Sequence, residues 1–431
     1  MIRVFFIKNR ILWSDYVLKN IALVLFSLRP LIDLAWADTY FWGLNLAGIT
    51  AIVLILIMLI DVVSSKNHQI SLYLFFFLIY MVMITALYSK NYSDFDTVLR
   101  FSSTMVFFVT VAPKINNKEL DRTILFFCIA TIVPIILSFA QLVGIIPYTY
   151  WDYIEGIVIE RASGGYRQPS VLTRFCIFGL IYALYFLESR KNTILKKLLI
   201  FLYIAINLVS IIISYHRTSY LMVFVIFILW NVLKYRNRIS QYFSRVLFLF
   251  IFGVLIFLLS YEFGIVKVDL NIFRKLISLD NVFIYENGHF NLILRGRGNI
   301  LNLLFETLYN SPIRIILFGN GININQITNT SMQIADMDFI RVIWNFGVIG
   351  LLLWVGHLFY LSNILIYCKS YVDSLYFRVG CILLLTYILW GFTVEVIGTP
   401  NIGYHSFLVI GYLYFQAKKK KKIMNISGEE N

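Results

Sequence analysis

Arginines and a few acidic and histidine residues gather in one long polar stretch, 286–341, of a chain that is otherwise apolar. The stretch contains Arg295, Arg297, Arg314, Arg341, His289, Asp336 and Asp338. Arginine is a planar, always-charged receptor for anions, and carboxylates and histidine are among the side chains that accept protons in catalysis. We therefore expect the chemistry of this protein to take place in this stretch.

The composition places that stretch on a membrane protein. The chain has 431 residues, of which 60% are hydrophobic and 14% charged, and its mean hydropathy is +0.79. A soluble domain of this length cannot bury so much apolar surface unless lipid acts as its solvent. The apolar runs are continuous and do not alternate, which excludes a porin-like barrel. The predicted fold class is an all-α, polytopic integral membrane protein.

Apolar runs that can cross about 30 Å of hydrocarbon predict about twelve transmembrane helices, with ten to thirteen compatible with the pattern. They lie near 16–35, 41–60, 70–88, 95–113, 123–146, 170–188, 197–214, 218–234, 246–263, 340–366, 376–394 and 402–417. We expect one polytopic domain, 1–431, in which 147–169 forms an outer loop. The segment 264–340 is expected to form a large outer loop domain with short amphipathic helices. No internal repeat is evident.

The distribution of basic residues predicts how the chain is oriented. Most lysines fall in alternate short loops and in the tail, 418–422, which is typical of the cytoplasmic side. An even number of spans then puts both termini in the cytoplasm and the 286–341 stretch outside. The net charge of +14 is explained in this way, with some attraction to anionic lipid. No nucleic-acid partner is expected, because the lysines form no folded basic face.

Three other outward segments also carry arginine, against the usual bias for that side. Arg161, Arg167 and Arg174 follow the fifth predicted span, His216 and Arg217 follow the seventh, and Arg29 closes the first. They predict a receptor for an anion on the outer face. The alternative is that these arginines reach lipid headgroups. The four cysteines lack metal-ligand or CxxC spacing, so no metal site is expected.

Three segments, in order along the chain, resemble a known family. They are RASGGYRQPSVLTRF, ISYHRTSYLMV, and the region from RGRG through SPIRIILFGNG to DMDFIRVIWNFGVIG. Together with the many spans, they are similar to the bacterial O-antigen and capsule polymerases of the Wzy type, which are grouped with the O-antigen ligases. Ligases typically carry a His-Asn pair where this chain has Asp336-Met337-Asp338, which favours a polymerase. The evenly spaced Arg-to-Gly repeats of some polymerase loops are not reproduced.

The resemblance implies a glycosyltransferase that polymerises polyprenyl-diphosphate-linked oligosaccharide units on the outer face of the bacterial cytoplasmic (inner) membrane. It implies a reaction without metal or cofactor, in which arginines hold the diphosphate and a carboxylate or histidine accepts the proton of the acceptor hydroxyl. The candidate diphosphate- or sugar-binding residues are Arg161, Arg167, Arg217, Arg295, Arg297, Arg314 and Arg341. The candidate bases are Asp336, Asp338 and His289, although Asp338 could instead cap the tenth helix.

The other partners that the resemblance implies are membrane lipids and, as an open possibility, a protein that regulates chain length. Two alternative functions also stay open. One is a ligase that transfers the finished glycan to another acceptor. The other is a non-enzymatic transporter, or flippase, of lipid-linked oligosaccharide, for which twelve spans would be usual.

Overall fold

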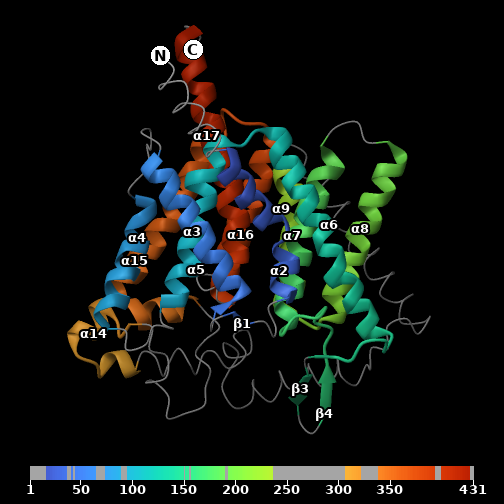
Figure 1. The fold of residues 1–431 in the computed structure, drawn as a ribbon, viewed down its shortest axis with the longest axis horizontal. Helices are drawn as coiled ribbons and strands as arrows, with labels where there is room; N and C mark the ends of the chain where they lie inside the picture. The colour runs from blue at the N-terminus through green and yellow to red at the C-terminus, as the bar shows by residue number, and fades with distance from the viewer. Residues whose placement is uncertain are drawn as a thin grey trace.

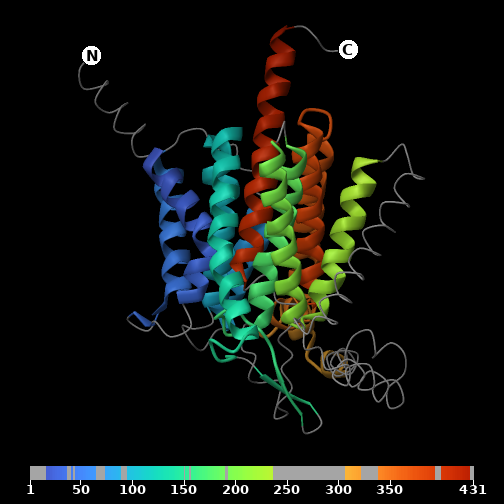
Figure 2. The same cartoon turned by 90° about the vertical axis from the view of Figure 1, so that its right-hand side faces the viewer.

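The computed structural model describes residues 16–35, 40–41, 44–64, 73–88, 95–149, 151–154, 157–189, 193–235, 306–321, 338–393 and 399–427. These residues form a bundle of helices with two short hairpins at one end (Figure 1). A second view, turned by 90°, shows that most helices run roughly parallel to one axis (Figure 2). The expected helical membrane fold is therefore present.

The helices are the 16–27 helix (Tyr16–Ser27), α2 (Arg29–Ala35), α3 (Leu46–Ser64), α4 (Tyr73–Tyr88), α5 (Phe95–Val106), α6 (Asn117–Leu142), α7 (Pro169–Glu188), α8 (Ile194–Ile213), α9 (Arg217–Lys234), α14 (Ile313–Phe318), α15 (Asp338–Cys368), α16 (Ser374–Thr393) and α17 (Pro400–Ser427). α5 continues into a π-helical turn, η2 (Phe107–Val111), and a 3-10 turn, η3 (Ala112–Lys114). The strands β1 (Tyr40–Phe41) and β2 (Leu44–Asn45) form one antiparallel hairpin, and β3 (Trp151–Ile154) and β4 (Ile157–Glu160) form the other. The sequence did not predict these strands.

Six helices in the described part of the chain are long and apolar enough to cross a membrane, and four shorter apolar helices accompany them. A helix lies at each predicted span that falls within the described residues. The predicted span near 246–263 lies outside them, as does most of the predicted loop domain 264–340. The count of twelve spans and the large loop domain therefore stay predictions.

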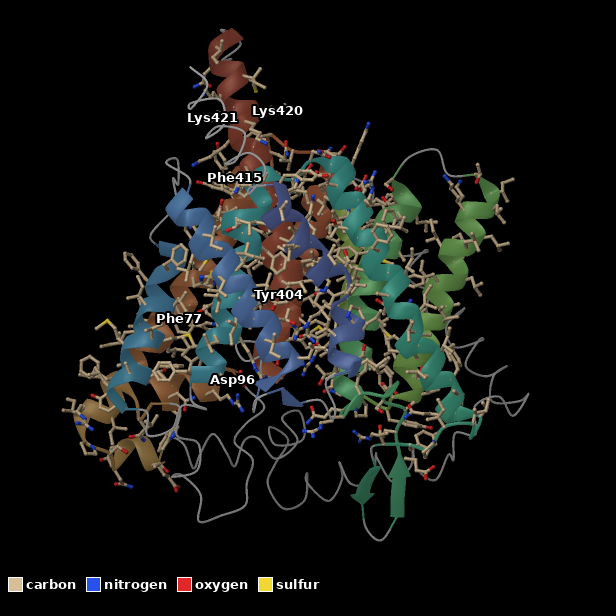
Figure 3. All side chains as sticks on the ribbon, viewed as in Figure 1. Phe77, Asp96, Tyr404, Phe415, Lys420 and Lys421 are labelled. Carbon is tan, nitrogen blue, oxygen red and sulfur yellow. The ribbon has the colours of Figure 1, made fainter. Side chains whose placement is uncertain are left out.

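The bundle has two chemically different ends. Lys420 and Lys421 on α17 project beyond one end, which we call the lysine end, while Asp96 lies near the other (Figure 3). We call the second the hairpin end, because both hairpins lie there (Figure 1). Within 46–235, and again within 338–427, successive long helices run in alternating directions between the two ends (Figure 1). Alternate loops therefore share an end, as the orientation argument assumed.

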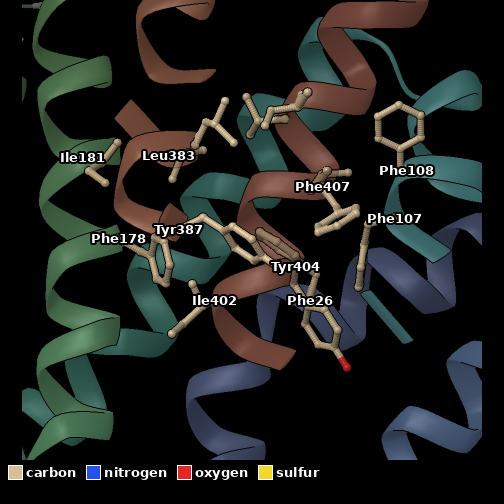
Figure 4. Close-up of a cluster of buried hydrophobic side chains, with 14 of the residues drawn as sticks. Phe26, Phe107, Phe108, Phe178, Ile181, Leu383, Tyr387, Ile402, Tyr404 and Phe407 are labelled. Carbon is tan, nitrogen blue, oxygen red and sulfur yellow. The ribbon is translucent and has the colours of Figure 1, made fainter. Parts of the chain in front are cut away.

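Aromatic side chains fill the centre of the bundle. Phe26, Phe107 and Phe178 surround the first turns of α17, which carry Phe407 (Figure 4). His405 lies in the same layer, with its ring 3.8 Å from that of Phe178. Many large apolar side chains on the outer surfaces of α3, α4, α6 and α8 are exposed, as expected where lipid is the solvent.

At the lysine end, one carboxylate connects three helices. Glu188 on α7 accepts hydrogen bonds from Trp230 Nε1 and Lys234 Nζ of α9, at 2.7 and 2.6 Å, and from Arg378 Nη1 of α16 at 2.6 Å. The guanidinium of Arg378 also lies 5.2 Å from the Trp230 ring. Glu188 therefore fixes the packing of α7, α9 and α16 at this end.

We predict that Glu188→Gln lowers the free energy of unfolding by about 1–2 kcal/mol, because it weakens charge-assisted hydrogen bonds that are partly exposed to solvent. Thermal unfolding of the purified protein in detergent measures the effect. Lys196→Gln, which changes an exposed charge at the same end, is the control and should leave the midpoint unchanged. Equal midpoints for the two variants would contradict the role given to Glu188.

Candidate functional site

We call the half of the bundle next to the hairpin end the hairpin half, and the other half the lysine half. The two halves differ in the kind of cation that they carry. Among the described residues, every lysine lies in the lysine half, and arginine is the only one of the two permanently charged cations found in the hairpin half. These arginines are Arg29, Arg100, Arg161, Arg167, Arg174, Arg217, Arg314 and Arg341. Arginine binds phosphate and carboxylate with two parallel hydrogen bonds, whereas lysine acts as a point charge. The hairpin half is therefore suited to bind an anion.

A buried ion pair lies between α2 and the start of α17. Arg29 Nη2 is 2.7 Å from Asp33 Oδ1, and the two side chains are only 3% and 4% exposed. Asn401 Nδ2 donates to Asp33 Oδ2 at 3.3 Å, and the guanidinium carbon of Arg29 lies 5.3 Å from the Tyr404 ring. The Tyr404 hydroxyl is 2.9 Å from Ser103 Oγ of α5. This cluster joins three helices that are far apart in the sequence.

Several polar atoms of this cluster keep hydrogen-bonding capacity. Within the described part of the chain, Arg29 Nε, Arg29 Nη1 and Asn401 Oδ1 are buried and have no hydrogen-bond partner. Buried polar groups are almost always paired, with protein groups or with water. The cluster can therefore still donate to, or accept from, a polar group that reaches it.

The loop 160–166 packs into the hairpin end of the bundle. Gln141 Oε1 of α6 accepts from the backbone N–H groups of Ser163 and Gly164, at 3.0 and 2.9 Å. A Cβ atom at Gly164, where φ is +61°, would lie 2.5 Å from the Pro134 carbonyl oxygen, so only glycine fits this approach. Arg161, at the start of the loop, is 9% exposed, and these contacts hold the backbone two and three residues after it.

Tyr166 connects this loop to the Arg29 cluster. Its hydroxyl donates to the Pro30 carbonyl oxygen at 2.7 Å, one residue after Arg29. Burial, and then the nearby Asp33 carboxylate, raise the pKa of Tyr166 well above its ordinary value, so the phenol stays a neutral donor. The following arginine, Arg167, is exposed. Of these two predicted residues, Arg161 is buried and Arg167 is exposed.

The SYHRTSY segment adjoins the same loop. Ala162 N donates to the Ile213 carbonyl oxygen at 3.3 Å, where α8 ends. His216 Nδ1 lies 2.7 Å from Ser219 Oγ and 3.5 Å from Thr173 Oγ1. The preceding residue, Tyr215, has φ +50°, the one left-handed backbone conformation of a non-glycine residue in the described part of the chain. α9 then begins at Arg217.

Arg314 and Arg341 form a second group at the hairpin end. Arg314 is exposed on α14, with its guanidinium carbon 4.9 Å from the Tyr88 ring of α4. Arg341 is half-buried in the first turns of α15. α14 and the β3–β4 hairpin lie on opposite sides of this end (Figure 1). The predicted arginines therefore divide into two groups along the same end.

The remaining predicted site residues are not tested. His289, Arg295, Arg297 and Asp336 lie outside the described residues. Asp338 and Arg217 are the first residues of α15 and α9, and the structure describes only their backbone. Their roles as bases or as diphosphate ligands stay predictions.

Sequence reasoning left out residues that the structure places beside the predicted ones. Arg29 and His216 were recognised as outward residues but not as site residues. The i,i+4 spacing of Arg29 and Asp33 on a short helix was the available signal for the ion pair. Nothing in the sequence pointed to Asn401, which is 368 positions away from Asp33.

No protein-family model matches the chain, and no curated protein matches it.

Proposed function

We propose that this protein is a membrane glycosyltransferase that polymerises polyprenyl-diphosphate-linked oligosaccharide units into a surface polysaccharide, as the sequence resemblance implies. The observation that supports it is that, among the described residues, the lysines lie in the lysine half and the Lys/Arg cations of the hairpin half are all arginines. In this proposal the hairpin end faces outward and the lysine end faces the cytoplasm, as the bias of lysine and arginine toward the cytoplasmic side requires.

Diphosphate chemistry explains why arginines would gather there. In the proposed step, the acceptor hydroxyl attacks the anomeric carbon of the donor glycan, and the bond to the diphosphate oxygen breaks. The departing diphosphate gains negative charge as this bond breaks, and positioned guanidinium groups stabilise that charge. The proton of the hydroxyl passes to a base. Asp336, Asp338 and His289 are the predicted bases.

Among the arginines predicted as diphosphate ligands, burial indicates which one should matter most. Arg161 is 9% exposed in a loop fixed by Gln141, so its guanidinium is already in place before substrate binds. Such preorganisation makes a donor effective in a transition state. Arg167 belongs to the same loop but is exposed, so it is an internal comparison.

We predict that Arg161→Gln lowers the rate of glycan elongation by about a hundredfold, the loss typical of removing one preorganised donor, and that Arg167→Gln has little effect. The measurement is chain extension by the purified full-length protein with lipid-linked repeat units, together with the length profile of surface glycan in cells. Equal activity of both variants, at equal protein level, would contradict the assignment of Arg161.

Deletion of the gene tests the function itself. Loss of a polymerase leaves single repeat units on the final acceptor, whereas loss of a ligase leaves long chains on the polyprenyl carrier. An unchanged glycan length profile would refute the polymerase proposal. The purified protein should extend chains in the presence of a chelator, since the predicted reaction needs no metal.

A transporter of lipid-linked oligosaccharide is the second candidate, and one observation favours it. The Arg29–Asp33 pair lies inside the bundle, and so does His357 of α15, which is 2% exposed and stacked on Phe407. Ionisable groups within membrane spans often mark the path of a transported substrate. Deletion of a flippase would trap repeat units on the cytoplasmic side, which separates the two functions in the same experiment.

A further inference from the structure

Two short segments at the hairpin end share a pattern that the sequence analysis did not find. Residues 313–319 read IRIILFG, and residues 340–347 read IRVIWNFG. Each begins with Ile-Arg, forms a helical stretch and ends with Phe-Gly. The arginines are Arg314 and Arg341, and the glycines are Gly319 and Gly347. The one-residue difference in length and the 20 residues between them hide the likeness.

The two glycines occupy the same unusual backbone conformation. Gly319 has φ +79° and ψ −174°, and Gly347 has φ +67° and ψ −171°. Gly347 lies inside α15, so it divides that helix into a first part, 338–346, and a second part, 348–368. L-residues rarely adopt such angles, which favours glycine at both positions.

The segments also contact each other reciprocally. A Cβ atom at Gly319 would lie 2.3 Å from the Asn345 carbonyl oxygen, and a Cβ atom at Gly347 would lie 2.3 Å from the Leu317 carbonyl oxygen. Each glycine therefore packs on the carbonyl two residues before the other glycine. This relation is approximately twofold symmetric. We call the contact between 317–321 and 344–347 the glycine clasp.

Hydrogen bonds close the clasp. Asn320 N donates to the Trp344 carbonyl oxygen at 3.1 Å, and Gly321 N donates to the Asn345 carbonyl oxygen at 2.9 Å. These carbonyls would lack partners at the end of the first part of α15, because the helix stops at Gly347. The 317–321 segment thus supplies the donors that a break in a membrane helix requires.

α4 packs against the clasp. The Tyr80 hydroxyl donates to the Phe346 carbonyl oxygen at 3.0 Å. Gly321 lies directly on Tyr88, because a Cβ atom there would be 2.8 Å from Tyr88 Cβ. The Tyr88 ring in turn lies 4.9 Å from the Arg314 guanidinium carbon. Arg314, the clasp and the first part of α15 are therefore parts of one packed unit.

We propose that Gly319 and Gly347 are positioning residues: the glycine clasp holds the first part of α15, which carries Asp338 and Arg341, in a fixed place beside Arg314. This inference rests on the proposed glycosyl transfer, because it assigns the clasp to the placement of the groups used there. Any side chain at either glycine separates the two backbones and moves the first part of α15. The rest of the bundle keeps its packing.

The test compares Gly347→Ala, Gly319→Ala and the double variant in the full-length purified protein. Each single variant is expected to lower glycan elongation per folded molecule by about tenfold to a hundredfold, since a displacement of about 1 Å can cost that much. The double variant should elongate glycan no more slowly than the less active of the two single variants, because both substitutions break the same contact. Additive losses would overturn the shared contact.

Two glycines of the same chain are matched controls. Gly356 lies in the second part of α15, and Gly144 has φ +77°; a Cβ atom at either meets nothing within 4 Å. Gly356→Ala tests alanine in the same helix, and Gly144→Ala tests the left-handed conformation without crowding. Both are expected to keep normal elongation. A loss in either control as large as that in Gly347→Ala would overturn the proposal.

Hydrogen exchange tests the clasp independently of any transfer reaction. Gly347→Ala should speed exchange of the Asn320 and Gly321 amide hydrogens by about tenfold or more, while amides of α16 and α17 keep their protection. Unchanged exchange at Asn320 and Gly321 refutes the clasp, whatever the protein does. Faster exchange with normal elongation refutes the positioning role. If gene deletion leaves glycan lengths unchanged, the proposed function fails, and the exchange result still decides the clasp.

Discussion

The substitution Arg29→Leu is expected to lower the free energy of unfolding by about 3–5 kcal/mol, because it leaves Asp33 as a buried charge without its cation. The substitution Asp33→Leu should lower the free energy of unfolding by a similar amount, because it leaves the Arg29 guanidinium buried without its carboxylate. The double variant should recover most of the loss, since replacing a whole buried ion pair by apolar side chains is often nearly neutral. Thermal unfolding in detergent, for the two single variants and the double variant, measures all three.

A second i,i+4 pair at the same end is the matched comparison. Asp96 Oδ2 lies 2.5 Å from Arg100 Nη2 on α5, but the two side chains are 45% and 20% exposed. Such a pair contributes about 0–1 kcal/mol, so Asp96→Leu should change stability little. If Asp96→Leu and Asp33→Leu were equally destabilising, burial would not be the cause.

The double variant also separates stability from chemistry at Arg29. If it folds stably but does not elongate glycan, Arg29 or Asp33 takes part in the reaction or in substrate binding. If it folds and elongates normally, the pair only joins α2 to α17. In that case the arginines of the loop and of α14 and α15 would remain the candidates for the diphosphate.

The substitution Gln141→Leu should strongly reduce glycan elongation, because Gln141 holds the loop that carries Arg161. Gln141 is 1% exposed, and its side-chain oxygen accepts from two backbone N–H groups. Without this acceptor, each buried N–H costs about 1–3 kcal/mol, so the 160–166 loop should leave its place at the end of the bundle. We expect elongation to fall by about tenfold or more, because Arg161 is then no longer preorganised.

Gln168→Leu is the control for Gln141→Leu. Gln168 lies in the same connection, just before α7, but its side chain is exposed. It should leave elongation and loop protection unchanged. Exchange of the Ser163 and Gly164 amide hydrogens reports the loop directly and should be faster in Gln141→Leu alone. Slow exchange in both variants would mean that Gln141 does not hold the loop.

Hydropathy was sufficient to predict the helical body, because a membrane span is defined by a local property of about 20 residues. The predicted spans match α6, α7 and α8 to within a few residues at most ends. The predicted span began only at 123, whereas α6 begins at Asn117; the capping box of Asn116 and Glu119 was a local signal for this start that the prediction did not use. Such features depend on neighbours along the chain.

The candidate site depends on contacts that no local pattern encodes. Asp33 meets Asn401, and Tyr166 meets Pro30, only because the bundle brings α2, α17 and the loop before α7 together. The break in α15 was also missed, because the apolar run 340–366 looks continuous to a hydropathy scale. Only the backbone angles of Gly347 show that the run contains two helices. The β3–β4 hairpin was missed because its strands, WDYI and IVIE, have four residues each and show no sustained alternation of apolar and polar residues.

The break at Gly347 has a consequence for the depth of the reaction. Beyond it, α15 continues for roughly 20 residues, which rise about 30 Å, the thickness of the hydrocarbon layer. In the proposed orientation, a span over 348–368 would put Gly347 at the plane where the hydrocarbon layer meets the lipid headgroups. A carrier lipid anchored in that layer would present its first phosphate at the same level as this plane, so the carrier need not be lifted out of the bilayer to be used.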